Sequence, residues 1–168
     1  MRTLISADQL QARVRALGIE IARDHPGGVH LVCVLRGAFV FTADLVRALP
    51  GTVTVDFITV SSYGLETTSS RAVRVLHDLE DPIENRPVVI VEDVVDTGLT
   101  LASLHDRLRA RLPRSLRTAC LLDKPMRRHA VVPVDYVGFA IDDHFVVGYG
   151  LDSGERYRNL PFIAVLDE

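Results

Sequence analysis

Apolar residues follow two different spacings along this chain of 168 residues. Residues 6–24 open with the letters SADQ, a capping-box pattern, and Leu10, Val14, Leu17 and Ile21 then recur at helical spacing. This segment predicts a helix that ends before the His-Pro-Gly-Gly turn. Two more helices are predicted by similar spacing, one through Phe41, Leu45 and Leu49, the other through Leu101, Leu104, Leu108 and Leu112 and ending at Pro113.

Short continuous apolar runs predict strands that are buried on both faces. These runs cover residues 29–35, 52–60, 87–94, 116–122, 134–140 and 144–150. Strands and helices alternate through the middle of the chain, which favours an α/β protein with a parallel β-sheet flanked by helices. No repeat or linker interrupts the pattern, so we expect a single domain over residues 1–168.

One long polar segment has no apolar anchor between Leu65 and Ala72. Residues 61–71 contain four serines, two threonines and one glycine, and residues 72–79 alternate well enough to be a return strand. The pattern predicts a hairpin flap with a mobile loop, because little burial offsets the entropy of ordering it.

Composition narrows the function classes. The net charge of −3 and the pI of about 6.1 disfavour nucleic-acid binding. No apolar run is long enough for a membrane span or a signal peptide, and Cys33 and Cys120 lie inside apolar runs as reduced thiols would, so we expect a cytoplasmic protein. The six histidines show no zinc-ligand spacing, so we expect surface or packing roles for them.

Three acids stand at the end of an apolar strand. Glu92, Asp93 and Asp96 follow residues 87–91, and the turn Thr-Gly-Leu-Thr at 97–100 leads into the next predicted helix. A helix N-terminus favours a phosphate, whereas acids beside it suit sugar hydroxyls or a magnesium ion. The segment therefore predicts a sugar-phosphate site. The alternative is that Asp96 only caps the helix while the other two acids are solvated.

The same segment, VVIVEDVVDTGLTL at 88–101, resembles the phosphoribosyl-pyrophosphate motif of the type I phosphoribosyltransferases. The segments LLDKP, VGFAIDDHFVVGYGLD and YRNLPFIAVL resemble the purine pocket and tail of the hypoxanthine-guanine branch, and VLRGAF and DFITVSSYG resemble its first two loops. These segments extend over nearly the whole chain and follow one another in the order expected for that family. It implies the type I phosphoribosyltransferase fold, with a small hood and a flexible hairpin flap.

The resemblance also implies a reaction. The 5-phosphoribosyl group of phosphoribosyl pyrophosphate passes to N9 of hypoxanthine or guanine, which gives IMP or GMP and pyrophosphate, with Mg²⁺ as cofactor. Asp96 is implied as the general base at purine N7, and the implied metal ligands are Glu92, Asp93 and Asp152. The implied phosphoribosyl-pyrophosphate site consists of Leu35, Arg36, Gly37, Ser62, Tyr63, Glu92, Asp93, Asp96, Thr97, Gly98, Leu99, Thr100 and Arg158.

The implied purine site consists of Lys124, Phe145, Val146 and Asp152. Lys124 would donate to the 6-oxo group and so exclude adenine, because an ammonium cannot accept a hydrogen bond. Phe145 would stack on the base, Val146 would meet its edge through the backbone, and Asp152 would hold magnesium at the pyrophosphate. From the residues alone, Lys124 could also be an exposed turn residue, Phe145 a core residue and Arg158 an ordinary surface arginine.

Two features of the implied site stand apart. Arg36 occupies a position where relatives commonly carry lysine, in a loop that often contains a cis peptide bond. Ser62 and Tyr63 would begin a lid that closes over the reacting centre.

The competing functions are a regulatory nucleic-acid binder on the same fold and a transferase for another base, such as xanthine or a pyrimidine. The resemblance further implies a homodimer or homotetramer.

Overall fold

The structure is a computed structural model that describes residues 1–61 and 73–166. The elements, in chain order, are β1 (Arg2–Ile5), α1 (Ala7–Asp24), β2 (Val29–Leu35), α2 (Phe39–Ala48), β3 (Val53–Ser61), β4 (Arg74–His77), β5 (Pro87–Val95), α3 (Leu99–Arg109), β6 (Ser115–Asp123), the 3-10 turn η1 (Pro125–Arg127), β7 (Tyr136–Ala140), β8 (Val146–Val147) and β9 (Ile163–Val165).

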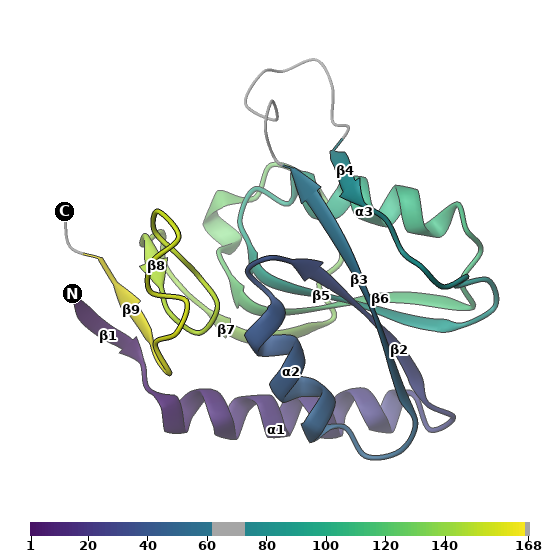
Figure 1. The fold of residues 1–168 in the computed structure, drawn as a ribbon, viewed down its shortest axis with the longest axis horizontal. Helices are drawn as coiled ribbons and strands as arrows, with labels where there is room; N and C mark the ends of the chain where they lie inside the picture. The colour runs from purple at the N-terminus through teal and green to yellow at the C-terminus, as the bar shows by residue number, and fades with distance from the viewer. Residues whose placement is uncertain (62–72, 167–168) are drawn as a thin grey trace.

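Within these residues, the central sheet has the strand order β4-β3-β2-β5-β6-β7 (Figure 1). Its strands pair in parallel except β4, which is antiparallel to β3. One core cluster joins α1 and α2 to the sheet through Leu17, Phe41 and Leu121. A second cluster joins α3 to the sheet through Leu104 and Ile90. The predicted parallel α/β sheet flanked by helices is confirmed, and the carboxyl ends of its parallel strands share one edge.

A small second sheet combines the two ends of the described chain. Its order is β1-β9-β8, and both pairs are antiparallel. β1 and β9 therefore lie side by side (Figure 1). This sheet is the hood that the resemblance implied, although neither β1 nor β9 was predicted as a strand.

The predicted boundaries of α1 are confirmed, whereas one predicted helix and one predicted strand are shorter in the structure. The Oγ atom of Ser6 accepts from Gln9 N at 3.2 Å, which confirms the capping box. The helix predicted through Leu112 ends at Arg109 with Ala110 as its C-cap. Leu112 lies outside it, with a φ of 56° and 67 % of its surface exposed.

The strand predicted over residues 144–150 is limited to β8, which belongs to the hood. Gly148, Tyr149 and Gly150 end it, since their φ values of 99°, 51° and 100° are incompatible with a strand.

β3 and β4 form the antiparallel stem that the flap prediction requires, with Ser61 opposite Arg74. The predicted loop, including Ser62 and Tyr63, lies outside the described residues.

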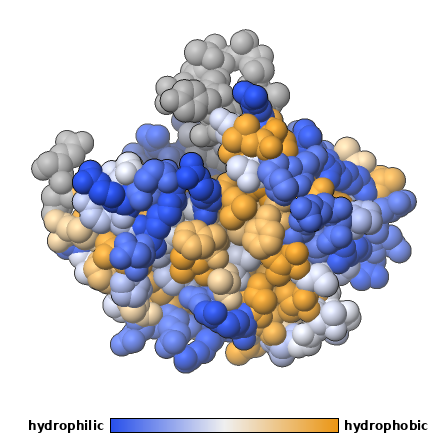
Figure 2. Space-filling view, in the orientation of Figure 1, coloured by the Kyte–Doolittle hydropathy of each residue, from blue (hydrophilic) through white to orange (hydrophobic). Residues whose placement is uncertain are grey.

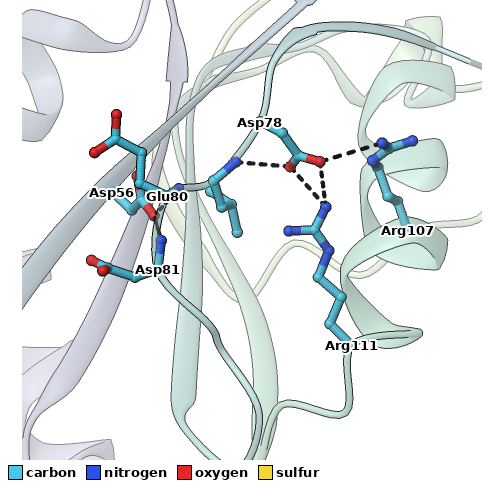
Figure 3. A network of polar contacts seen from close by, with 7 residues as sticks. Asp56, Asp78, Glu80, Asp81, Arg107 and Arg111 are labelled. Carbon is cyan, nitrogen blue, oxygen red and sulfur yellow. Dashed lines mark hydrogen bonds and ion pairs between the residues drawn. The ribbon is translucent and has the colours of Figure 1, made fainter.

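Two buried or partly buried carboxylates hold the chain that follows β4 (Figure 3). Asp56 on β3 is 5 % exposed, and its carboxylate accepts from the backbone N–H groups of Glu80 and Asp81, each at 2.9 Å. Asp78 accepts from Arg111 at 2.6 Å and from Arg107 at 3.4 Å, and both arginines belong to the α3 region. These contacts tie the flap stem to the helix that begins at the acid-rich segment.

Apolar side chains also reach the surface. Figure 2 shows them gathered in the middle of one face, with hydrophilic side chains on either side. Phe39 of α2 and Phe57 of β3 are exposed aromatic side chains, at 44 % and 42 %. Among the described residues, the helices are too short or too polar to cross a bilayer.

Candidate active site

The loop after β2 approaches the acids at the end of β5. The Leu35–Arg36 peptide bond is cis, as the resemblance implied for this loop. A Cβ added to Gly37 would lie 1.6 Å from Oδ2 of Asp93, so any side chain there would displace this carboxylate. The Leu-Arg-Gly turn and the acid-rich segment are thus in direct contact.

Burial changes the acid–base behaviour of both acids on β5. Glu92 is 6 % exposed, and burial together with the adjacent Asp93 raises its pKa well above the ordinary value. The pKa of Asp93 is also raised, chiefly by burial, while Arg158 opposes the shift. The solvated alternative is therefore wrong for Glu92. Two carboxylates held in poorly solvated positions are suited to hydroxyl donors or a cation.

The Thr-Gly-Leu-Thr turn forms a small hollow at the N-terminus of α3. A cavity of about 80 Å³ is lined by Asp96, Thr97, Gly98 and Thr100, with Glu92 at its side. Gly98 is the N-cap, with a φ of 81° and no side-chain cap. The alternative that Asp96 caps α3 is therefore wrong. The N–H of Leu99 donates to the Thr97 hydroxyl at 3.3 Å. The helix N-terminus and the threonine hydroxyls make the hollow suitable for a phosphate.

The predicted purine residues line the neighbouring edge of the sheet. Lys124 follows β6, is 9 % exposed, and its Nζ donates to the carbonyl of His144 at 2.7 Å. The exposed-turn alternative for Lys124 is therefore wrong. Phe145 is 60 % exposed, so it is not a core residue, whereas Val146 on β8 is buried. The lysine is held by the chain that carries the exposed phenylalanine.

The loop after β8 brings Asp152 and Arg158 together. Nη2 of Arg158 lies 2.9 Å from Oδ1 of Asp152, and its Nη1 donates to the carbonyl of Gly150 at 2.8 Å. The Arg158 side chain is 20 % exposed and doubly held, so it is not an ordinary surface arginine. Arg36 lies against the same loop, with its Nη1 donating to Glu155 at 2.8 Å.

Two arginines that sequence analysis did not single out surround Asp96. Nε of Arg127 donates to Oδ1 of Asp96 at 3.0 Å, and Nη1 of Arg128 donates to the Asp96 carbonyl at 3.0 Å. Arg128 also pairs with Asp123 at the end of β6. The only signal in the sequence was the position of both arginines shortly after Lys124 and Pro125.

A larger cavity lies between α1, α2 and the 158–161 segment. Its volume is about 780 Å³, and Val14, Phe39, Val40 and Leu160 are among its lining residues. None of the acids of β5 lines it. The chemistry-bearing side chains gather instead at the carboxyl edge of the central sheet.

Fold and site together define an α/β protein with a phosphate hollow, buried carboxylates and a held lysine at the carboxyl edge of its parallel sheet. Residues 6–154 match the family described as the phosphoribosyl transferase domain. The chain therefore belongs to the phosphoribosyltransferase family.

Several similar proteins are hypoxanthine-guanine phosphoribosyltransferases. Hypoxanthine-guanine phosphoribosyltransferase of Mycobacterium tuberculosis is 50 % identical over 171 residues, which cover 98 % of this chain and 85 % of that protein. The Bacillus subtilis enzyme of the same name is 45 % identical over 166 residues, covering 98 % and 92 %. The crystal structure of a hypoxanthine-guanine phosphoribosyltransferase from Bacillus anthracis has a TM-score of 0.96 at 46 % identity and 99 % coverage of both chains.

Proposed function

We propose that this protein is a purine-salvage hypoxanthine-guanine phosphoribosyltransferase. The observation that carries the proposal is the set of groups at the carboxyl ends of the adjacent strands β5 and β6: the phosphate hollow at Thr97–Thr100, the acids of β5 and the held ammonium of Lys124. These groups match, in order, the 5-phosphate, the ribose hydroxyls and the 6-oxo group of the two substrates.

The reaction follows from this arrangement. Purine N9 forms a bond to C1 of the ribose while the C1–oxygen bond breaks, and the electron pair of that bond leaves with pyrophosphate. The transition state resembles an oxocarbenium ion, as in glycoside hydrolysis. Asp96 takes the proton that the purine loses at N7. Leu35, Arg36 and Gly37, with Arg158, hold the pyrophosphate, while Glu92 and Asp93 hold the ribose hydroxyls.

The purine side of the site supplies specificity. Lys124 is fixed by the His144 carbonyl, so its remaining N–H bonds can meet a 6-oxo group but not a 6-amino group. Phe145 stacks on the base with its exposed ring, and the backbone of Val146 meets the base edge. Ser62 and Tyr63 close the site as a lid in this proposal.

A divalent metal ion, Mg²⁺ in this proposal, fits the donor set. Glu92, Asp93 and Asp152 offer hard oxygen ligands, and the first two are carboxylates whose charge is poorly solvated. Among the described residues, groups of three or more potential ligands close enough to enclose an ion are absent. The ion would therefore be held by one or two of these carboxylates together with substrate oxygens, where it offsets the charge that develops on pyrophosphate.

We further propose that the protein acts in the cytoplasm as a homodimer or homotetramer. Cys33 and Cys120 are buried free thiols, in keeping with a reducing compartment. Phe39 and Phe57 are exposed aromatic side chains, which a second copy of the chain could cover. Light scattering during size-exclusion chromatography measures the assembly directly.

A base panel tests the proposed function. Phosphoribosyl pyrophosphate and Mg²⁺ are supplied with hypoxanthine, guanine, xanthine, adenine or uracil, and nucleotide formation is followed. We expect IMP and GMP to form, adenine and uracil to stay unchanged, and excess chelator to stop the reaction. Turnover of adenine at a comparable rate, or full activity in chelator, would refute the proposal.

A further inference from the structure

Within residues 1–61 and 73–166, Arg127 is the only side chain that pairs with the carboxylate of Asp96. Its Nε donates to Oδ1 at 3.0 Å, which leaves Oδ2 without a protein partner there. The adjacent Arg128 donates to the Asp96 carbonyl, also at 3.0 Å. Arg127 thus holds the side chain of Asp96, and Arg128 holds its backbone.

Arg127 also reaches the purine side of the site. Its Nη1 lies 3.4 Å from Oδ2 of Asp143, and the other oxygen of Asp143 lies 3.4 Å from Nζ of Lys124. Asp143 stands two residues before Phe145. The guanidinium therefore spans from the carboxylate of the proposed general base to the loop that carries the proposed stacking ring.

We propose that Arg127 is a positioning residue for the transfer, because it holds Oδ1 of Asp96 and so presents Oδ2 to N7 of the purine. This inference rests on the proposed function. A carboxylate held by one charge-assisted hydrogen bond loses rotational freedom and keeps its second oxygen available. The proton moves from N7 to Oδ2 of Asp96, and Arg127 remains protonated throughout.

The same contact contributes little to folding. The Arg127 and Asp96 side chains are 47 % and 43 % exposed, and ion pairs at such exposure add little stability. Removal of the Arg127 guanidinium should therefore leave the fold intact, so that its effect appears in turnover.

A double-mutant cycle tests the inference. We expect Arg127→Met to lower kcat roughly tenfold, a part of what a general base supplies, with both KM values within about twofold. Arg127→Lys, which keeps the positive charge, should recover much of the loss. In the Asp96→Asn background, Arg127→Met should cause no further decrease, since the group that it positions is already absent.

The control variant is Arg107→Met. Arg107 is 46 % exposed and lies 3.4 Å from Asp78, far along α3, so its loss should leave kcat unchanged. An unchanged kcat for Arg127→Met, or an equal decrease with and without Asp96, would overturn the inference while wild-type activity stands. Absence of nucleotide formation by the wild type would overturn the proposed function, and the inference with it.

Discussion

Replacement of Glu92 by glutamine should flatten the pH dependence of stability in the ligand-free protein. Glu92 is 6 % exposed, and burial, followed by the charge of Asp93, raises its pKa well above the ordinary value of 4.5. A raised folded-state pKa gives stability that is fully present below the unfolded-state value. That stability is lost as pH rises from about 4.5 toward the folded-state value.

The magnitude follows from linkage. Each pKa unit between the folded and unfolded states corresponds to about 1.4 kcal/mol. A destabilisation of about 1 kcal/mol lowers the Tm of a domain of this size by about 2–4 °C. We therefore expect the Tm of the wild type to fall more than that of Glu92→Gln as pH rises above about 4.5.

Thermal unfolding followed by circular dichroism, without ligand and with chelator, measures this difference. Asp93 contributes a pH-dependent loss of the same sign in both proteins, because its pKa is also raised. Glu84→Gln is the control. Glu84 is exposed, so the Tm of this variant should depend on pH in the same way as that of the wild type. Parallel profiles for wild type and Glu92→Gln would refute the view that Glu92 is a buried, destabilised carboxylate.

Three further substitutions separate binding from stability. Lys124→Met should raise the KM for hypoxanthine at least roughly tenfold, the cost of a lost charge-assisted hydrogen bond, as steady-state kinetics will measure. Gly37→Ala should raise the KM for phosphoribosyl pyrophosphate on the order of tenfold, because a Cβ there would lie 1.6 Å from Oδ2 of Asp93. Arg111→Met should lower Tm by at most about 2–4 °C with kcat unchanged, since its 2.6 Å ion pair with Asp78 is partly solvated.

Each of these substitutions has a clear contrary outcome. A KM for hypoxanthine that does not change would remove Lys124 from the purine site. Gly27→Ala is the control for the Gly37 variant, because a Cβ at Gly27 would have no neighbour within 4 Å. Equal KM values for the two alanine variants would show that the close approach has no role. A large fall in kcat for Arg111→Met would mean that this ion pair serves more than stability.

Local signals were sufficient for the middle of the fold. Helix α1 follows from its capping box and apolar spacing, and β2 and β5 follow from continuous apolar runs. The hood could not be predicted in the same way. β1 pairs with β9, which lies at the opposite end of the sequence, and each strand is too short to show a pattern of its own. Long-range pairing, rather than local propensity, decides those residues.

In the candidate site, too, some residues could be predicted from local sequence and others depend on the fold. Glu92, Asp93 and Asp96 could be identified because acids at the end of a buried strand conflict with the expected burial of their neighbours. Arg127 gave no such signal, because an arginine in a polar turn is ordinary until the fold brings it to Asp96. The burial of Lys124 was equally invisible, since it depends on the backbone of residue His144 from another segment.

The most direct test of the account is the rate of IMP formation by Asp96→Asn. Hypoxanthine, phosphoribosyl pyrophosphate and Mg²⁺ are supplied to the wild type and to the variant, and kcat and both KM values are measured. If Asp96 takes the proton from the purine, kcat should fall by roughly 10²-fold or more while both KM values stay within a few-fold. A variant with the kcat of the wild type would contradict the central claim that this carboxylate carries the transfer.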